Sequence, residues 1–276
     1  MGLKIKRKEG FDTGLKRVML EEGQKALHHL RETPDPHEAV HEARKSFKKV
    51  RAAHRLVRDC SGFYKEENRF YRDQGRKISD LRDATAFLET LEGIKQRHGD
   101  TLQPEAFRVL AQGLEERRSQ MTDSYLADNT LQEIAEALRA HLDGFAEKEL
   151  QVEDFREIAP SIRRVYVRGR LMMQKAAHSG SPEDYHEWRK QAKYLRYMIQ
   201  MVRNVWKPVF KTLESEFHQL TNHLGEAHDF YNLKQVVQQE LLPMQSHSER
   251  VLLYGIIGYG RKEQRRQALR LGQKVY

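Results

Sequence analysis

A twelve-residue pattern that occurs twice is the feature that most constrains how this chain can fold. The first copy runs from Val40 to Arg51 and the second from Tyr185 to Arg196, so the copies lie 145 positions apart. His, Glu, Arg, Lys, Lys and Arg occupy matching positions in both copies. Such a repeat predicts a duplicated fold in which two equivalent helices present the same side chains.

Apolar and basic residues follow separate rows along each of these helices. A spacing of three and four residues between apolar positions predicts a seam that packs into a core. The first seam is Val40, Ala43, Phe47, Val50, His54 and Val57, and the second is Tyr185, Trp188, Ala192, Leu195, Ile199 and Val202. One position further along lie the two basic stripes, which are His41, Arg44, Lys48, Arg51, Arg55 and Arg58, and His186, Arg189, Lys193, Arg196, Gln200 and Arg203.

No acidic residue falls on either stripe. Like charges three or four positions apart cost roughly 0.2–0.5 kcal/mol per pair in an isolated helix. At about 1.5 Å per residue the first stripe is roughly 26 Å long. The arrangement therefore favours a site for a long polyanion, because arginine binds phosphate through its planar fork and lysine adds point charges. The alternative is a solvated surface whose bases aid solubility or pair with acids on neighbouring helices.

The two stripe histidines, His41 and His186, are open to two interpretations. Each is either a hydrogen-bonded structural histidine at the edge of the seam or a phosphate donor whose charge varies near neutral pH.

The bulk composition agrees with a folded protein that has an anionic partner. The chain has 276 residues, enough for one large domain or two fused halves. Charged residues make up 32%, but 38% hydrophobic residues at helical spacing argue against disorder. The net charge of +9 favours nucleic acid, an anionic membrane or polyphosphate as partner.

The sequence also bears on the compartment. Cys60 is the one cysteine, so no intramolecular disulfide is possible and a reducing environment fits best. Basic residues from Lys4 to Lys8 are not followed by an apolar region of signal type. No stretch approaches about 18 apolar residues, so we expect no membrane-spanning helix and no membrane insertion. We expect a cytoplasmic protein.

Beyond residue 13 the spacing predicts helix almost throughout, and we expect an all-α fold. Two strong helix starts are Asp35-Pro36-His37-Glu38 and Ser181-Pro182-Glu183-Asp184, which combine a cap, a proline and an acid. Each leads directly into one copy of the pattern. Further breaks are expected at Thr33-Pro34, Cys60-Ser61-Gly62, His98-Gly99-Asp100, Ser179-Gly180 and Leu242-Pro243.

A second repeated element supports duplication of the whole fold. Leu81-Arg82-Asp83-Ala84 lies 146 positions before Ala227-His228-Asp229-Phe230. We therefore expect one domain, 1–276, of two antiparallel helical bundles with about four or five helices each. The halves are 13–150 and 155–276, with a linking helix at 131–150 and a pseudo-two-fold axis that brings the stripes face to face.

These residues resemble the CHAD family, the conserved histidine α-helical domain. The His-x-x-Arg-Lys-x-x-Lys-x-x-Arg core, its repetition and the Leu-Arg-Asp element carry the resemblance, which runs from about residue 13 to the C-terminus. It implies two pseudo-symmetric four-helix bundles that bind inorganic polyphosphate in a basic cavity or groove, often at polyphosphate granules. It also implies a stand-alone form, without the triphosphate tunnel domain to which the family is often fused. His228 departs from the Arg-Asp form of the first half.

The predicted site is non-catalytic and needs no metal or cofactor. By position the family's basic residues are His41, Arg44, Lys45, Lys48, Arg51, His186, Arg189, Lys190, Lys193 and Arg196. Further predicted contacts are Arg55 on the same stripe, Arg72 and Arg76 on the next helix, and Lys207 and Lys211 in the second half. Another basic cluster, Arg163, Arg164 and Arg168, is either ordinary surface or part of a contact.

Three other functions remain open at this point. The run His37-Glu38-Ala39-Val40-His41 matches a zinc-protease motif, although it follows Pro36 in a first helical turn and has no recognisable third ligand. His228-Asp229 is the pair found in helical metal-dependent phosphohydrolases; the alternative is that Asp83 and Asp229 pair with or orient neighbouring basic residues. Nucleic-acid binding would use the same stripes, but no helix-turn-helix, zinc site or RNP-like strand is evident.

Overall fold

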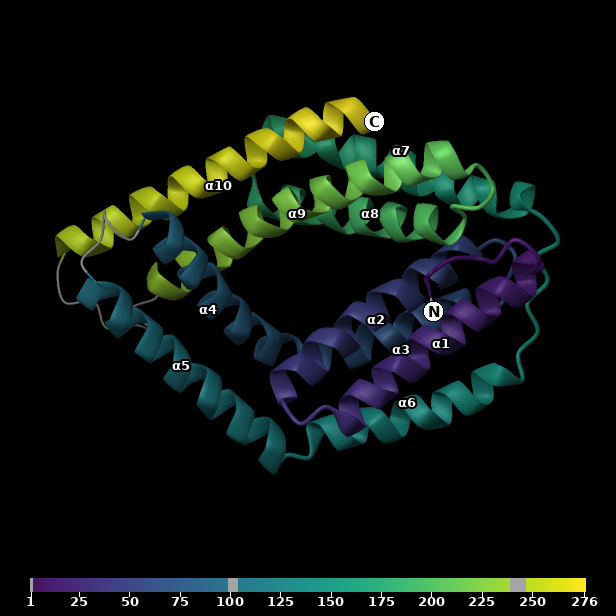
Figure 1. Cartoon of the computed structure of the whole chain (residues 1–276), viewed down its shortest axis with the longest axis horizontal. Helices are drawn as coiled ribbons and strands as arrows, with labels where there is room; N and C mark the ends of the chain where they lie inside the picture. The colour runs from purple at the N-terminus through teal and green to yellow at the C-terminus, as the bar shows by residue number, and fades with distance from the viewer. Residues whose placement is uncertain (1, 99–103, 239–246) are drawn as a thin grey trace.

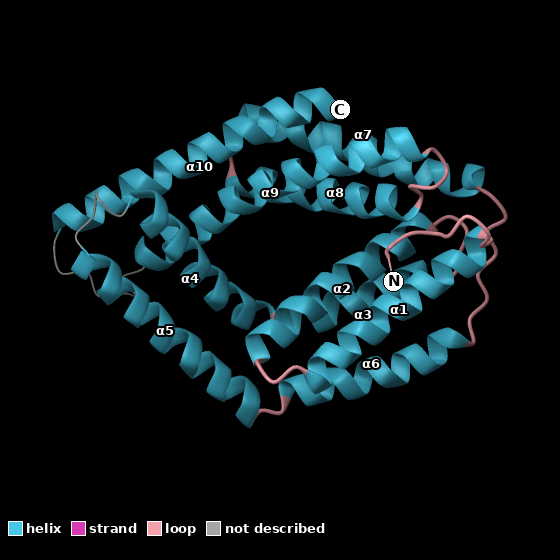
Figure 2. Cartoon of the chain, viewed as in Figure 1, coloured by secondary structure: helices cyan, strands magenta, loops and turns pink. Residues whose placement is uncertain are grey.

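The structure, a computed structural model, describes residues 2–98, 104–238 and 247–276. Within these ranges the chain is all-helical and contains no strand (Figure 2). The first six helices are α1 (Phe11–Glu32), α2 (Pro36–Leu56), α3 (Tyr64–Lys77), α4 (Ser79–His98), α5 (Pro104–Ala127) and α6 (Thr130–Ala146). They are followed by α7 (Phe155–Ser179), α8 (Pro182–Met201), α9 (Lys207–Gln238) and α10 (His247–Val275).

The two expected helix starts are confirmed, and they place the repeated pattern at the beginnings of α2 and α8. Asp35 Oδ1 accepts a hydrogen bond from the backbone N–H of His37 at 3.0 Å. Ser181 Oγ accepts one from the backbone N–H of Asp184 at 3.1 Å. Proline opens both helices, where its missing N–H costs nothing. The breaks expected after His98 and at Leu242-Pro243 lie outside the described residues.

In the described part of the chain the buried apolar side chains form three clusters. One cluster joins α1, α2, α3 and α6, and its members include Val40, Phe47, Tyr71 and Leu138. Another lies where α1 and the end of α2 meet α7, α8, α9 and α10, and includes Leu15, Val57, Trp188 and Phe217. The third joins α4 and α5 to α9 and α10, and includes Phe87, Leu110, Phe230 and Ile257. The core therefore continues across both halves of the chain.

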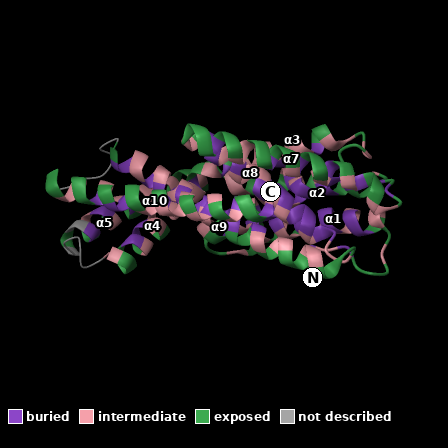
Figure 3. Ribbon diagram, turned by 90° about the horizontal axis from the view of Figure 1, so that it is seen from above, coloured by how far each residue is buried: buried purple, intermediate pink, exposed green. Residues whose placement is uncertain are grey.

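The expectation of four or five described helices holds for the second half of the chain but not for the first. Phe11–Ala146 contains six of the described helices and Phe155–Val275 contains four. One reason is that α9 runs unbroken for 32 residues, whereas the corresponding stretch divides at Ile78 into α3 and α4. In addition, α4 and α5 pack against α9 and α10 and form the narrower end of the molecule in Figure 3. The internal duplication stays a prediction.

The predicted linker 131–150 is helical over most of its length, and it also contributes side chains to the hydrophobic core. Ile134 and Leu138 of α6 are fully buried in the cluster with α1, α2 and α3. None of the described helices combines the length and the apolar character needed to cross a membrane.

Four helices close into a circuit, which we call the four-helix ring. Helix α2 contacts α8, α8 contacts α9, α9 contacts α4, and α4 contacts α2 (Figure 1). Both copies of the repeated pattern and both copies of the second repeated element therefore lie on this ring.

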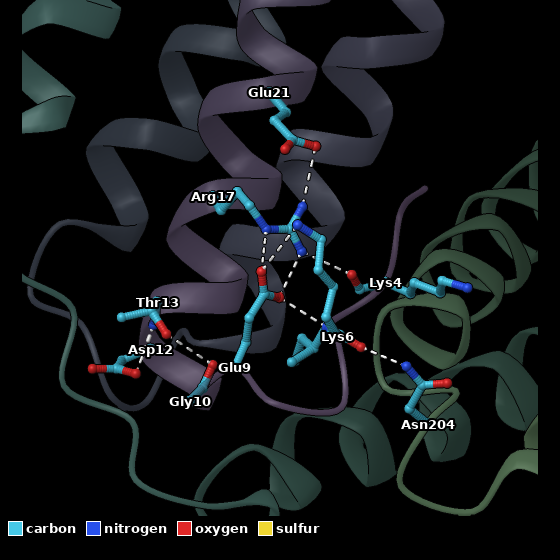
Figure 4. A network of polar contacts seen from close by, with 10 residues as sticks. Lys4, Lys6, Glu9, Gly10, Asp12, Thr13, Arg17, Glu21 and Asn204 are labelled. Atoms are coloured by element: carbon cyan, nitrogen blue, oxygen red, sulfur yellow. Dashed lines mark hydrogen bonds and ion pairs between the residues drawn. The ribbon is translucent and has the colours of Figure 1, made fainter. Parts of the chain in front are cut away.

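Residues 3–10 form an N-terminal arm that joins α1 to the end of α8 (Figure 4). The guanidinium of Arg17 donates to Glu9 Oε1 at 2.7 Å and to the Lys4 carbonyl at 2.9 Å. The hydrogen bonds from Arg17 hold the pKa of Glu9 down at about 2. The backbone N–H of Ile5 donates to the carbonyl of Met201 at 2.9 Å, which attaches the arm to the second half.

We expect Arg17→Met to lower the free energy of unfolding by about 1–3 kcal/mol at pH 7, the cost of leaving a charged partner unpaired. Because the folded-state pKa of Glu9 lies below its unfolded value, this contribution is present above pH 4.5 and is lost toward pH 2. Urea unfolding at pH 7 and pH 3 measures the difference between variant and wild type. A difference that does not shrink at pH 3 would contradict this assignment.

Candidate anion-binding site

Both seams are buried as the spacing predicted. The members of the first seam, on α2 and its C-cap, are at most 2% exposed: Val40, Ala43, Phe47, Val50, His54 and Val57. The members of the second seam, on α8 and its C-cap, are at most 8% exposed: Tyr185, Trp188, Ala192, Leu195, Ile199 and Val202. The seam histidine, His54, stays neutral because burial lowers its pKa to about 4.

The basic stripes lie beside the seams and are mostly half-buried. His41 and Arg58 at the two ends of the first stripe are exposed, while the positions between them are only partly so. Contact between α2 and α8 brings the stripes close together, since Arg189 of α8 lowers the pKa of Lys48 in α2, and Lys48 lowers the pKa of Lys193 in α8. The cations of α2 and those of α8 therefore lie together in one site.

The second repeated element completes this site from the other two helices of the ring. Arg82 and Asp83 come from α4, and His228 and Asp229 come from α9. Asp83 interacts electrostatically with Arg44 and Arg82, and Asp229 interacts with Arg189 and Arg82. The site thus draws its charged groups from four helices that are far apart in the sequence.

Lys48 and Lys193 are the most strongly perturbed cations of the site. Burial, followed by the charges of Arg189 and Arg44, lowers the pKa of Lys48 to about 7. Burial, followed by Arg189 and Lys48, lowers the pKa of Lys193 well below its usual value. The environment of both amines therefore disfavours their charged form unless an anion binds beside them.

Arginine side chains extend the site along both stripes. One Nη atom of Arg44 donates to the carbonyl of Gly75, and Nε of Arg51 donates to Asn68 Oδ1 at 3.2 Å. The guanidinium of Arg55 lies 4.2 Å from the ring centre of Tyr194, and that of Arg196 lies 5.6 Å from the ring centre of Tyr197. Stacking on tyrosine holds each guanidinium plane in place and leaves its edge available to an anion.

Few acids neutralise these cations. Among the described residues, no ion pair within 4 Å joins an acid to the cations Arg44, Lys48, Arg51, Arg55, Arg189, Lys193 and Arg196. The Nε atoms of Arg44, Arg55, Arg189 and Arg196 are buried and make no hydrogen bond within the described chain. Buried unpaired cations are costly, so this arrangement is suited to receive several anionic oxygens.

The histidines of the site have lowered affinity for protons. The rings of His186 and His228 lie 4.8 Å apart between centres. Burial and the neighbouring Arg189 lower the pKa of His186, and lower that of His228 to about 3. Burial and Arg82 likewise lower the pKa of His41. In the free protein these rings are therefore neutral hydrogen-bonding groups near pH 7.

Other predicted contacts lie outside this group of unpaired cations. Lys45 is paired with Glu42 at 3.0 Å and Lys190 is paired with Glu187. Arg72 is paired with Asp73 at 2.7 Å, and Arg76 is 72% exposed. Lys207 and Lys211 are exposed at the start of α9. The structure therefore brings together the stripe residues of the prediction. Lys45, Lys190 and Arg72 lie close enough to interact electrostatically with His41, His186 and Arg51, but each is ion-paired with an acid. Arg76, Lys207 and Lys211 are exposed.

Sequence reasoning missed three members of the site, Arg82, Tyr194 and Tyr197, whereas Asp83 and Asp229 could be expected to pair with or orient neighbouring basic residues. Arg82 belongs to the second repeated element, but its spacing along the helix did not indicate that it faces the stripes. Tyr194 and Tyr197 carried no signal, because tyrosine next to a seam is ordinary core composition.

In the zinc-protease motif, both ring nitrogens of His37 lie within hydrogen-bonding distance of threonine hydroxyls. Nδ1 of His37 lies 3.0 Å from Thr85 Oγ1, and Nε2 lies 3.0 Å from Thr122 Oγ1. Throughout the described ranges there is no group of three His, Cys, Asp or Glu side chains that could hold a metal ion. His228, the candidate phosphohydrolase ligand, has Arg189, Lys193 and Lys48 as charged neighbours, which disfavour a metal cation there.

The fold and the site define an all-helical protein with a cationic site inside a ring of four helices. The chain belongs to the CHAD family, because the family model described as CHAD domain matches residues 18–238. No curated protein matches the sequence. Among solved structures, PptA from Streptomyces chartreusis has the same fold, with a TM-score of 0.63 at 13% sequence identity over 96% of this chain and 100% of that chain.

Proposed function

We propose that this protein binds inorganic polyphosphate non-covalently at the four-helix ring and performs no chemistry on it. The observation that carries the proposal is the set of facing, half-buried cations, centred on Lys48 and Lys193, that form no ion pair within 4 Å in the described ranges. A flexible phosphate chain supplies regularly spaced oxyanions to such a set, and release of its counterions drives binding. Membership of the CHAD family supports polyphosphate as the ligand and polyphosphate granules as a location.

Within this proposal the binding unit is the whole chain, 1–276, with repeat halves 13–150 and 155–276. Successive phosphoryl groups contact Arg44, Lys48 and Arg51 on one side and Arg189, Lys193 and Arg196 on the other. His41 and His186 donate hydrogen bonds, and Arg55 extends the path. The paired lysines Lys45 and Lys190 contribute only after they leave their glutamates.

Nucleic-acid binding is the alternative that uses the same charges. Proteins that hold single strands stack bases on accessible aromatic rings. The aromatic residues of the motif helices, Phe47, Tyr185 and Trp188, are 2%, 8% and 0% exposed. They are therefore unavailable to bases, which favours a ligand without them.

Competition binding tests the proposal directly. Labelled long-chain polyphosphate is displaced by unlabelled polyphosphate, duplex DNA or RNA at matched phosphate concentration and ~150 mM salt, where exposed charges are screened beyond about 8 Å. We expect polyphosphate to compete at least about tenfold better than either nucleic acid, a difference of about 1.4 kcal/mol. Equal competition by DNA or RNA would make the stripes a general electrostatic surface and replace this proposal by the alternative.

A further inference from the structure

The turn between α8 and α9 exposes the most accessible tryptophan of the chain. Trp206 is 62% exposed and the adjacent Val205 is 46% exposed. The other tryptophan, Trp188, is fully buried. Exposed apolar groups of this kind mark contact with another surface.

An apolar pocket lies behind this turn. Its volume is about 510 Å³, and its apolar lining includes Phe11, Phe155, Val202 and Val205. The N-terminal arm forms one wall of the pocket and is fastened to the turn, because Asn204 Nδ2 donates to the carbonyl of Ile5 at 2.7 Å. The arm, the turn and the start of α7 lie together at the right-hand end of Figure 1. The exposed apolar groups are therefore held on a fixed platform.

Basic side chains surround the exposed apolar groups from three separate segments. We call the whole set the Trp206 patch, and it consists of Lys6, Arg7, Arg156, Val205, Trp206, Lys207 and Lys211. Two of its bases have acidic neighbours but remain accessible: Lys6 is 58% exposed beside Glu9, and Arg156 is 90% exposed beside Asp154. Within the described ranges no ion pair within 4 Å joins Arg7, Lys207 or Lys211 to an acid.

We propose that the Trp206 patch is a peripheral contact surface for an anionic lipid membrane. Tryptophan prefers the boundary between lipid chains and water, since its ring is apolar and its N–H is polar. Lysine and arginine around it reach anionic headgroups, each contributing about 1 kcal/mol near such a surface. The ring projects from a turn instead of lining a groove for a peptide, and a lipid surface supplies both the apolar and the anionic partner.

This contact needs no spanning helix, so it revises the expectation of no membrane insertion only for the side chains of Val205 and Trp206. A membrane contact also gives a role to Lys207 and Lys211, which were predicted from the sequence to bind polyphosphate but are exposed at the start of α9. None of the stripe residues belongs to the patch, so this proposal stands whether or not polyphosphate is the ligand of the four-helix ring.

Intrinsic fluorescence gives a direct test, because the two tryptophans differ so strongly in exposure. The full-length protein is mixed with vesicles of phosphatidylcholine alone or of phosphatidylcholine with phosphatidylglycerol. We expect a blue shift of the emission and protection from iodide quenching only with the anionic vesicles. Trp188 is already buried, so the change reports Trp206.

Variants identify the surface. Trp206→Ala should weaken sedimentation with anionic vesicles at least about tenfold, equal to about 1.4 kcal/mol. Lys207→Gln with Lys211→Gln should weaken it by about twenty-five-fold, at roughly fivefold per lysine. Val251→Ala serves as the matched control, because Val251 is 54% exposed on α10 and outside the patch. It should bind like wild type, and polyphosphate binding by all these variants should be unchanged.

Three outcomes would overturn the proposal. The first is no sedimentation of wild type with anionic vesicles, which would leave an acidic protein partner as the occupant. The second is equal sedimentation of wild type and Trp206→Ala. The third is an identical fluorescence change with polyphosphate and no lipid, which would assign the patch to free phosphate polymer.

Discussion

Replacing Lys48 and Lys193 together by methionine should abolish polyphosphate binding and make the free protein more stable. Their pKa values are lowered, which means that the folded state disfavours the charged amines it contains. Methionine has a similar length and no charge, so it removes that cost and fills the same space. The variant loses function and gains stability, as expected when charge is retained for a ligand.

The expected sizes follow from the same argument. Two charge-assisted contacts of about 1.5–3 kcal/mol each predict at least about a hundredfold loss of affinity. The free energy of unfolding at pH 7 should rise by about 1–3 kcal/mol, less than the full pKa shift of Lys48 implies, because the side chain is partly exposed. Isothermal titration and urea unfolding measure the two quantities.

Methionine is a better probe here than charge reversal. A glutamate in place of Arg189 would lie close to Asp229 and destabilise the fold for an unrelated reason. Lys262→Met on the exposed face of α10 is the matched control and should alter neither quantity. A double variant that keeps wild-type affinity, or that unfolds more easily, would show that the two lysines serve the fold.

Polyphosphate affinity should fall as pH rises from 7 to 9, by about tenfold per pH unit for each lysine that must gain a proton. In the free protein Lys48 loses its proton near pH 7. An adjacent oxyanion raises that pKa, so binding above pH 7 requires proton uptake, whereas below pH 7 the amine is already charged. The slope therefore appears above pH 7 and flattens below it. Titrations at constant ionic strength measure it.

This assignment places the pH dependence on lysine instead of on the histidines that give the family its name. Burial lowers the pKa values of His41 and His186 from the ordinary value of 6.5, so they are neutral over the range tested. Lys48→Arg keeps the charge but does not titrate there and should reduce the slope. His41→Gln with His186→Gln should leave it unchanged. A slope that disappears in the histidine variant instead would return the effect to the imidazoles.

The local features of the fold could be predicted because they depend on neighbours in the sequence. Prolines and caps begin α2 and α8 where expected, and every seam position is buried. What sequence patterns did not indicate is that α4 and α5 pack against α9 and α10. That arrangement is decided by which apolar faces are left uncovered after the first bundle forms, and spacing along one helix does not contain this information.

For the candidate site, too, the features that depend on spacing along one helix could be predicted from the sequence. Spacing placed Arg44, Lys48 and Arg51 on one row because the period of a helix is known. Lys207 and Lys211 were assigned to the site by analogy between the halves, but the beginning of α9 lies with the N-terminal arm at the end of the molecule. Analogy of position is reliable only while the two halves remain alike.

The sequence by itself determined that this chain is helical, that each motif helix buries one row and carries a cationic row beside it, and that the row occurs twice. The repeat also predicted that the two cationic rows face each other, and α2 and α8 are in contact. Only the tertiary structure decided that α4 and α9 add Arg82, Asp83, His228 and Asp229, and that Lys48 and Lys193 are the cations whose pKa values are lowered most. The reason is that the helical period is a local property, whereas a pKa depends on burial and on charges brought near by distant parts of the chain.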